Sequence, residues 1–494
     1  MSRAPLIHET MAQAARRRPS ATAVRDETGA WTYRQLDRFS RSVCAWLSAQ
    51  GIRRGERVLV RIPNSRAAVG LLYGVIRYGA ICVPVNPDVR PYHLKSILTD
   101  CEPALVIKAS DADEASVGAD VPATDIDQLS RHLPEPLPER ESDRARATDI
   151  ALLMYTSGST SSPKAVVCRH AQIAFAASVV AERLAYQEDD VVYCRLPFSF
   201  DYGLYQVFLC ALASAELAVT GRQPEAAVLG YASKYRATVL PLVPTLAHVL
   251  VRLARRSSVR PPVRLLTNTG AELSPSTAAQ LRALFSGSSL VLMYGMTECK
   301  RVTIAETDDD VRHPGSVGTA LPGTYVDVVS DTGAILPPGQ PGQIVVRGPH
   351  LMDGYWRAPE ETARRYGLHP ATGERCLFTG DVGVLDTEGR LTFLGRRDEI
   401  FKRHGVRTST AELEGAALDI PGVSEAAVLP PGADGLVHLW VSTTDSPTDI
   451  LRALGERLEP AKLPDHCWVC DRLPHTVHGK VDKQRLRRGE WTIA

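Results

Sequence analysis

The clearest chemistry in this sequence lies in a run of hydroxyl side chains that surrounds one glycine and ends in a lysine. Residues 154–170 read MYTSGSTSSPKAVVCRH and overlap the end of the apolar segment DIALLMY (149–155), which predicts a strand. A Gly/Ser/Thr loop after a strand can direct backbone N–H groups and hydroxyls at an anion, and Lys164 adds a mobile positive charge. The Walker pattern G-x-x-x-x-G-K-[ST] is absent. The segment is therefore either an unusual phosphate-binding loop or a solvated Ser/Thr-rich turn.

The elements around this loop predict α/β layers. Segment 31–52 carries Leu36, Phe39, Val43 and Leu47 at helical spacing, and a second helical pattern in 93–101 gives way to an apolar strand after Pro103. From about residue 314 strands alternate with turns. Ser409 and Glu412 form a capping box that opens a helix in a further small unit. We predict two domains, 1–397 and 398–494, with the boundary at Asp398.

Composition excludes several classes of partner. The 494 residues include 57 Lys+Arg and 56 Asp+Glu, so the net charge of +1 gives no reason to expect nucleic acid or an acidic membrane as partner. No segment is apolar for the length of a membrane span, and the first residues lack the apolar stretch of a secretory signal. The ten cysteines include one CxxC, Cys467 and Cys470, without a second ligand pair for zinc. We expect buried reduced thiols and a cytoplasmic location.

Six further motifs resemble, in order, those of one enzyme superfamily. YTSGSTSSPKAV is similar to the phosphate loop of the superfamily of acyl- and aryl-CoA synthetases, peptide-synthetase adenylation domains and luciferases. GAICVPVNPDVRP (79–91), NTGAEL (268–273), YGMTE (294–298), TGDVG (379–383), GRRDEIFKRHGVR (395–407) and HGKVDK (478–483) follow the family's order. The resemblance spans nearly the whole chain. It implies a large N-terminal domain of layered α/β sheets with a β-barrel-like part, a hinge, and a small mobile α+β lid.

The resemblance implies activation of a carboxylic acid by ATP and Mg²⁺, with release of pyrophosphate and formation of an acyl adenylate. An enzyme of this kind must offset the repulsion between the acid and the triphosphate. Lys480 is implied to bridge the acid and the α-phosphate, Thr297 to contact the α-phosphate, and Glu298 to bind Mg²⁺. The residues implied to hold the nucleotide are Thr156, Ser157, Gly158, Ser159, Thr160, Lys164, Gly270, Ala271, Glu272, Tyr294, Asp381 and Arg396. Asp398 would act as the hinge.

The acid pocket is implied to lie in LPFSFDYGLYQVF (196–208) and its neighbours. Its residues would be Phe200, Asp201, Tyr202, Tyr205, Met293, Gly295 and Arg301. Asp201 resembles the aspartate that holds the substrate's amino group in amino-acid adenylation domains. An isolated carboxylate beside apolar groups is costly, so either the substrate supplies a cation or the protein does, through Lys300 or Arg301. Both interpretations remain open, and a medium-sized or aromatic acid fits the pocket better than a long acyl chain.

The acceptor and two departures from the family pattern also remain open. Since no carrier domain follows Ala494, we expect a free-standing enzyme that transfers its acyl group to CoA or to the phosphopantetheine of a separate carrier protein. The alternatives are an amino-acid adenylation enzyme that loads a carrier, a luciferase-like oxygenase, and a non-catalytic nucleotide-binding relative. Ser161 and Ala165 stand where the family commonly has glycine, and a Cβ is costly there if the backbone needs a positive φ.

Overall fold

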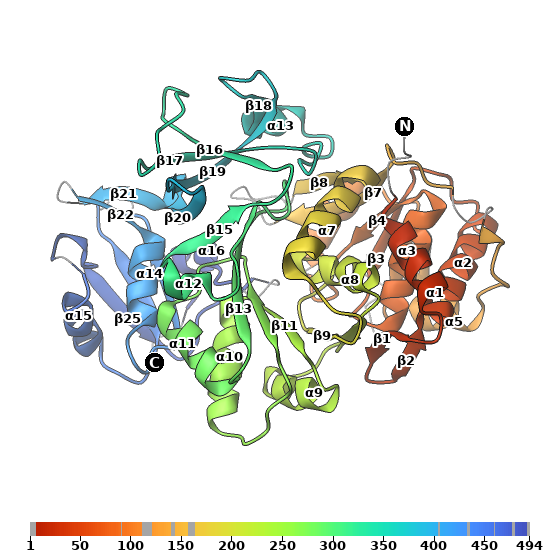
Figure 1. Cartoon of the computed structure of the whole chain (residues 1–494), viewed down its shortest axis with the longest axis horizontal. Helices are drawn as coiled ribbons and strands as arrows, with labels where there is room; N and C mark the ends of the chain where they lie inside the picture. Colours follow the sequence, from red (N-terminus) through yellow and green to blue (C-terminus); the bar gives the residue numbers. More distant parts are fainter. Residues whose placement is uncertain are drawn as a thin grey trace.

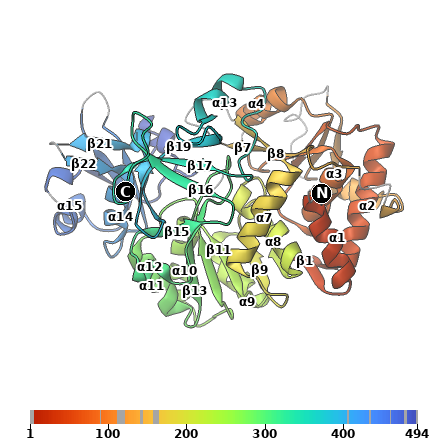
Figure 2. The same cartoon turned by 45° about the horizontal axis from the view of Figure 1, so that its top comes forward.

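The computed structural model of the chain describes residues 6–89, 91–110, 121–139, 144–156, 164–403, 406–431, 435–458, 460–476 and 480–491. Two sheets lie before residue 397 and two smaller sheets lie after residue 400 (Figure 1); we refer to these parts as the body and the lid, after the predicted domains. The body runs from the N-terminal helices through the strands before residue 397, and the lid packs against one side of it in both views (Figure 2).

The first sheet of the body carries the strand that leads into the candidate phosphate loop. Its strands lie in the order β6-β5-β3-β4-β7-β8, parallel except for the last pair. Their bounds are β3 Arg57–Arg61, β4 Ile81–Pro84, β5 Leu105–Lys108, β6 Ala123–Asp125, β7 Ile150–Thr156 and β8 Lys164–Arg169. The apolar run predicted as a strand is thus β7, and it pairs antiparallel with β8 across the loop.

The second sheet of the body follows the path β16-β17-β19-β20-β15-β14-β13-β12-β11-β9-β10-β1-β2, with β18 paired to β19. The strands β9 to β13 are parallel neighbours, whereas those from β14 to β20 are antiparallel. Their bounds are β1 Thr22–Asp26, β2 Gly29–Thr32, β9 Val191–Cys194, β10 Glu216–Val219, β11 Val239–Leu242, β12 Leu265–Asn268, β13 Ser289–Tyr294, β14 Thr303–Ile304, β15 Ser316–Ala320, β16 Tyr325–Val329, β17 Gly342–Arg347, β18 Tyr366–Leu368, β19 Arg375–Leu385 and β20 Arg390–Arg396.

This path confirms the predicted α/β class but not a closed barrel. Among the described strands the antiparallel part continues the parallel sheet through β13 and β14 and does not return to close a ring. The sequence shows short strands with turns in this region, and such a pattern is the same for an open meander and for a barrel. The β-barrel-like part is therefore corrected to an open extension of the sheet.

Helices fill the space between and around the sheets. Their bounds in the body are α1 Ile7–Arg17, α2 Tyr33–Ala49, α3 Arg66–Tyr78, α4 Pro91–Cys101, α5 Ile126–Arg131, α7 His170–Leu184, α8 Asp201–Ala213, α9 Val228–Lys234, α10 Pro244–Arg255, α11 Pro275–Leu284, α12 Asp309–Arg312 and α13 Pro359–Arg365, with the 3-10 turn η2 Glu225–Ala227. Helix α8 is buried along nearly its whole length because its residues are apolar all round. No helix within the described ranges has both the length and the hydrophobicity of a transmembrane segment.

The lid is built from β21 Ile400–Arg403 with β22 Val406–Ser409, and from the sheet β23 Glu425–Leu429, β24 His438–Ser442 and β25 His466–Cys470. Its helices are α14 Thr410–Leu418, α15 Pro447–Gly455 and α16 Lys483–Arg487, with the 3-10 turns η3 Arg397–Glu399 and η4 Pro460–Lys462. Ser409 caps α14 by accepting a hydrogen bond from the Glu412 backbone N–H at 3.1 Å, which is one half of the predicted capping box; the Glu412 carboxylate instead accepts from Thr408 and Lys462. All ten cysteines are free and buried, Cys467 and Cys470 among them.

Two histidines buried in the body predict that the fold loses stability in acid. His170 and His350 are fully buried, and burial lowers the pKa of His170 to about 3 and that of His350 to about 4. Both protonate more readily in the unfolded chain, near pH 6.5, so protonation favours unfolding as the pH falls below that value. We expect each to lower the free energy of unfolding by about 1.4 kcal/mol per pH unit between pH 6.5 and 4. Urea unfolding at several pH values measures this slope.

The variant His350→Gln separates this effect from that of the carboxylates. It should flatten the dependence of the free energy of unfolding on pH, while the same change at exposed His132 should leave the dependence as in the wild type. An unchanged slope in His350→Gln would contradict the assignment.

Candidate active site

The candidate site lies where the parallel strands β11, β12 and β13 end. In a parallel sheet the carboxyl ends of the strands meet at one edge, and the loops that follow them form ligand sites. Gly270 follows β12 and has φ +91°, a conformation that favours glycine. A Cβ placed there would lie 3.6 Å from the Phe200 ring and 3.8 Å from Cε of Lys480. The lid lysine and the residue before α8 therefore meet at the same glycine, although all three are far apart in the sequence.

Lys480 comes from the lid, and its side chain lies beside Gly270 of the body. Its backbone is held by Thr476, whose N–H donates to the Lys480 carbonyl at 2.7 Å. Desolvation by the surrounding protein lowers the pKa of Lys480, and Arg396 lowers it further, whereas Asp201 and Asp381 oppose the shift. Asp201 belongs to the predicted acid pocket and Asp381 to the predicted ribose site. The ammonium therefore lies within electrostatic reach of both predicted subsites, as a group that bridges acid and nucleotide requires.

The predicted ribose site is a buried carboxylate between two strands. Asp381 in β19 is the register partner of Arg396 in β20, and its Oδ1 lies 3.9 Å from Nε of Arg396. Its Oδ2 accepts a hydrogen bond of 2.7 Å from Oη of Tyr294, at the end of β13. Burial raises the pKa of Asp381, while Arg396 and the Tyr294 hydrogen bond lower it. Tyr294 thus helps to keep this carboxylate ionised and oriented.

Removing the Tyr294 hydroxyl is expected to weaken nucleotide binding. In Tyr294→Phe the KM for ATP should rise by about 10-fold, because a hydrogen bond to a charged group contributes about 1.5–3 kcal/mol. Loss of the hydrogen bond also raises the pKa of Asp381 further, so the acid limb of the kcat/KM profile for ATP should move to higher pH. Steady-state kinetics between pH 5 and 8 test both effects. An unchanged acid limb would contradict this role for Tyr294.

Thr156 and Lys164 face each other as register partners at the ends of β7 and β8, and Oγ1 of Thr156 donates to the Lys164 carbonyl at 3.4 Å. Ser157, Gly158, Ser159, Thr160 and Ser161 lie outside the described residues. Nζ of Lys164 forms an ion pair of 2.7 Å with Glu361 in α13. Ala165 is a buried strand residue without a positive φ, so its Cβ causes no backbone strain. The departure from glycine at this position is therefore harmless to the conformation seen here.

Thr297 and Glu298 form a turn after β13, as the YGMTE motif predicts. Glu298 is 7% exposed, and its Oε1 accepts a hydrogen bond of 2.5 Å from Oη of Tyr355. Its backbone carbonyl accepts from the Met352 N–H at 2.9 Å. Among the described residues no side chain hydrogen-bonds to Oε2 of Glu298. One carboxylate oxygen is thus fixed and the other remains available, which fits a residue that holds Mg²⁺ jointly with phosphate oxygens.

The predicted acid pocket contains a buried ion pair. Asp201, the first residue of α8, is 3% exposed, and its Oδ2 lies 3.2 Å from Nη1 of Arg301, which is 5% exposed. The Arg301 guanidinium lies over the Tyr202 ring at 4.8 Å, and Oη of Tyr202 bonds to Thr267. The structure therefore pairs Oδ2 of Asp201 with Arg301, which is one of the two interpretations left open by the sequence.

The other residues predicted for the pocket lie around this pair. Tyr205 and Met293 are buried, and Tyr205 has no hydrogen-bond partner for its hydroxyl within the described residues. Gly295 is packed so tightly that a Cβ there would lie 1.9 Å from the Lys300 carbonyl oxygen. The sequence suggests Lys300 only as an alternative partner for Asp201. In the structure it is instead a separate buried cation beside the pair.

The remaining predicted residues lie towards the lid. Ala271 and Glu272 are on the surface that faces the lid, where the surrounding protein and then the charge of Glu414 raise the pKa of Glu272 to about 7. The backbone of Asp398 lies in η3, between β20 and β21, and its side chain is not described.

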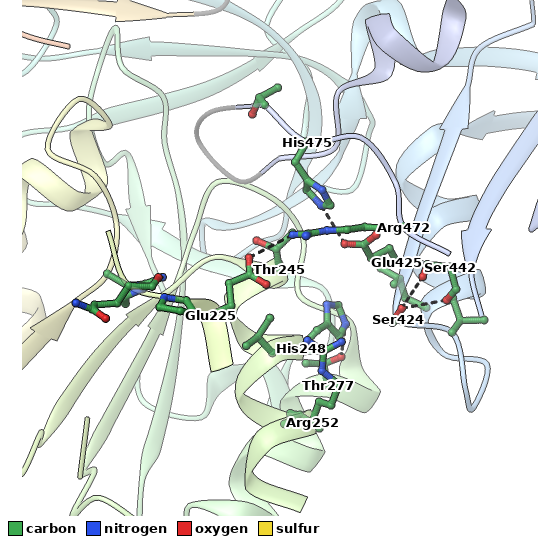
Figure 3. A pocket seen from close by; sticks show the side chains of 18 of the residues that line it. Glu225, Thr245, His248, Arg252, Thr277, Ser424, Glu425, Ser442, Arg472 and His475 are labelled. Atoms are coloured by element: carbon green, nitrogen blue, oxygen red, sulfur yellow. Dashed lines mark hydrogen bonds and ion pairs between the residues drawn. The ribbon is translucent and has the colours of Figure 1, made fainter. Parts of the chain in front are cut away.

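A cleft of about 1280 Å³ separates the lid from α10 of the body (Figure 3). Glu225 of the body forms an ion pair of 3.5 Å with Arg472 of the lid, and His475 lies 3.0 Å from Glu425. On the body side, Oγ1 of Thr277 and Nε2 of His248 are 3.0 Å apart. Those of the predicted nucleotide and acid residues that the structure describes do not line this cleft. It is an additional feature beside them, at the side where the lid and body meet.

Sequence reasoning missed the residues that hold the predicted ones in place. Glu361 binds Lys164, Tyr355 binds Glu298, and Cys168 contacts Lys300, at 3.4 Å from Sγ to Nζ. None belongs to a recognisable motif, and each lies far from its partner in the sequence. A single sequence offers no signal for such contacts.

Comparison with known proteins identifies similar chains over the whole length. The family model described as "AMP-binding enzyme" matches residues 11–356. The L-proline–[L-prolyl-carrier protein] ligase of Pseudomonas fluorescens is 28% identical over 98% of this chain and 99% of its own. Tyrocidine synthase 2 of Brevibacillus parabrevis is 26% identical over 96% of this chain, which spans only 13% of that relative's length.

Among solved structures, VinN in complex with L-aspartate superposes with a TM-score of 0.72 and 40% identity. The match covers 80% of this chain and 99% of the VinN chain. The similarity therefore includes most of the body, in which the predicted nucleotide and acid subsites lie.

Proposed function

We propose a specific reaction for this chain, which belongs to the family of AMP-binding enzymes: the activation of an amino acid as aminoacyl-AMP, followed by its transfer to a thiol. The family and its superfamily of adenylate-forming enzymes, inferred above from the motifs, are confirmed by the matches along the chain. In the first step a carboxylate oxygen of the acid attacks the α-phosphorus of ATP. The bond from that phosphorus to the oxygen bridging to the β-phosphate breaks, and pyrophosphate leaves.

In this proposal different residues bind the reacting carboxylate, the ribose and the phosphates. Lys480 places its ammonium between the attacking carboxylate and the α-phosphate, where negative charge builds up. Asp381, held by Tyr294, accepts the ribose hydroxyls. Lys164 exchanges Glu361 for the departing phosphates. Glu298 would hold Mg²⁺ through its available oxygen, and the ion would neutralise phosphate charge.

The transfer step requires the lid to move. Cε of Lys480 lies close to Gly270, and the charges of Asp201 and Asp381 act on its ammonium. We propose that rotation at Asp398, the boundary between the proposed domains 1–397 and 398–494, withdraws Lys480 and admits the thiol. The thiol then attacks the acyl carbon, a thioester forms, and AMP leaves with the carboxyl oxygen.

The observation that carries an amino-acid substrate is the buried carboxylate of Asp201, whose charge acts on Lys480. Among the described residues only its Oδ2 takes part in a hydrogen bond, so Oδ1 can accept from a ligand's ammonium. A charged donor is the partner that best compensates a buried carboxylate. VinN, similar over the body of the chain, has been solved with an amino acid, L-aspartate, which supports this assignment.

For the acceptor we propose the phosphopantetheine thiol of a carrier protein. A relative that this chain matches over 99% of its length is a carrier-protein ligase. Arg252, Arg255 and Arg256 are exposed along one side of α10 at the cleft, where they can contact an acidic protein surface. CoA presents the same thiol and is the second acceptor to test.

The Asp201–Arg301 pair also favours a second candidate, the activation of an acid without an amine. If Arg301 alone neutralises Asp201, the pocket needs no ammonium. Pyrophosphate exchange into ATP separates the two: amino acids should support it, and the matched acids without the amino group should not. Exchange with the amine-free acids alone would refute amino-acid activation. Incubation with CoA or with a pantetheinylated carrier then identifies the acceptor by mass spectrometry.

A further inference from the structure

We propose that the substrate is an amino dicarboxylic acid, and that Lys300 binds the carboxylate that does not react. This inference rests on the proposed function, because it names the class of amino acid that the same pocket selects. It follows from the buried charges of the pocket, from the backbone that holds Lys300, and from a buried hydroxyl that lacks a partner.

Two buried cations lie beside Asp201, and only one of them forms an ion pair with it. Lys300 is 1% exposed, Arg301 is 5% exposed and Asp201 is 3% exposed. Arg301 pairs with Asp201. Within the described part of the chain, no carboxylate lies at ion-pair distance from Nζ of Lys300.

The contacts that Lys300 does make are weak ones. Nζ lies 3.4 Å from Sγ of Cys168 and 5.7 Å from the centre of the Tyr205 ring. A thiol is a poor hydrogen-bond acceptor, and an aromatic face offers much less than a carboxylate. Because a buried ammonium without an anion is costly, the pocket favours a ligand that supplies one.

The backbone fixes Lys300 in this position. Its φ is +63°, a left-handed conformation that is unfavourable for a residue with a side chain, and its N–H donates to the Met296 carbonyl at 2.6 Å. Gly295 leaves no room for a Cβ against the Lys300 carbonyl. Strain of this kind persists where the surrounding structure holds it, so Lys300 is directed inward rather than left free to reach solvent.

Tyr205 adds an independent sign of a missing ligand. It is 3% exposed, and its hydroxyl has no hydrogen-bond partner among the described residues. Lys300, Arg301 and Asp201 all act on this part of the pocket, since Lys300 lies over the Tyr205 ring and the charges of the other two act on its hydroxyl. A buried hydroxyl without a partner costs free energy unless a ligand bonds to it.

One ligand chemistry satisfies all of these groups. An ammonium bonds to Asp201, a second carboxylate bonds to Lys300 with the Tyr205 hydroxyl close by, and the reacting carboxylate remains for Lys480. The phosphates of ATP do not meet this need, because they belong with Lys164 and Glu298 in the proposed arrangement.

Pyrophosphate exchange with truncated substrates tests the proposal. L-Alanine and β-alanine are L-aspartate without one or the other carboxylate, and succinate is L-aspartate without the amine. We expect L-aspartate or L-glutamate to exceed all three in kcat/KM by at least about 100-fold, because a site built for polar groups rejects analogues that lack them.

The variant Lys300→Met tests the residue itself. Its kcat/KM for the amino dicarboxylic acid should fall by about 100-fold, whereas that for β-alanine and L-alanine should stay level or rise. Lys95→Met, at an exposed lysine on α4, is the matched control and should behave as the wild type. If Lys300→Met does not fold, Lys300→Arg, which keeps the charge, should retain the preference for the second carboxylate.

The outcomes separate failure of the second-carboxylate site from failure of amino-acid activation. Equal use of L-alanine, β-alanine or larger neutral amino acids would overturn the second-carboxylate site and leave amino-acid activation intact. Exchange with succinate but with no amino acid would overturn both. Equal loss of all substrates in a normally folded Lys300→Met, with the same melting temperature as the wild type, would show that Lys300 is structural and overturn its assignment.

Discussion

The variant Lys480→Ala is expected to form the acyl adenylate at least about 1,000-fold more slowly than the wild type, because it loses a preorganised charge where the transition state gains one. The lysine comes from the lid and lies beside Gly270, between Asp201 and Asp381. Pyrophosphate exchange measures this half-reaction. Desolvation lowers the pKa of Lys480, so the alkaline limb of the wild-type rate should fall at lower pH than that of an ordinary lysine.

Two comparisons make this prediction specific. Transfer from a supplied acyl adenylate to the thiol should proceed in Lys480→Ala at close to the wild-type rate, because the Lys480 ammonium is needed only while the adenylate forms. Arg488→Ala, an exposed change on the same lid, should affect neither step. Equal loss of both half-reactions in Lys480→Ala would refute the role assigned to this residue.

The variant Asp201→Asn is expected to reduce kcat/KM for the amino acid by about 100-fold or more, since the substrate ammonium loses its buried charged partner. The same change leaves Arg301 buried without its ion-pair partner. The melting temperature should therefore fall too, because breaking a buried pair costs about 3–5 kcal/mol. Exchange assays and thermal unfolding measure the two effects separately.

The double variant Asp201→Asn/Arg301→Gln separates a structural role of Asp201 from a binding role. It removes both members of the pair, so it should regain most of the lost stability. If Asp201 binds the ammonium, activation of the amino acid should stay low. Recovery of activity together with stability would contradict that role.

Much of the fold could be predicted from the sequence because the sequence signals for helices and helix caps are local. The helix predicted within 31–52 is α2, which runs from Tyr33 to Ala49. Ser409 caps α14, as its spacing with Glu412 predicts. Helical periodicity and capping depend on neighbours within a few residues. Whether the strands after residue 314 close into a barrel depends on distant pairings, and there the expectation of a barrel-like part was wrong.

The residues of the candidate site could be predicted from the sequence where they belong to recognised motifs. Asp381 and Tyr294 were placed together by the resemblance, and the structure brings them to 2.7 Å. The sequence could not show whether Lys300 or Arg301 pairs with Asp201. Two cations adjacent in the sequence competed for it, and the φ of +63° at Lys300, which directs the two side chains differently, is set by tertiary packing.

The contact between Lys164 and Glu361 has a consequence for how ionic strength affects the enzyme. In the proposed role, the arriving nucleotide meets an ammonium that already has a counter-charge, so binding swaps one anion for another at this position. Lys164 releases the Glu361 carboxylate when it binds a phosphate, and screening by salt weakens the Lys164–Glu361 contact and the Lys164–phosphate contact alike. The dissociation constant for ATP should then vary with salt concentration less steeply in the wild type than in Glu361→Gln.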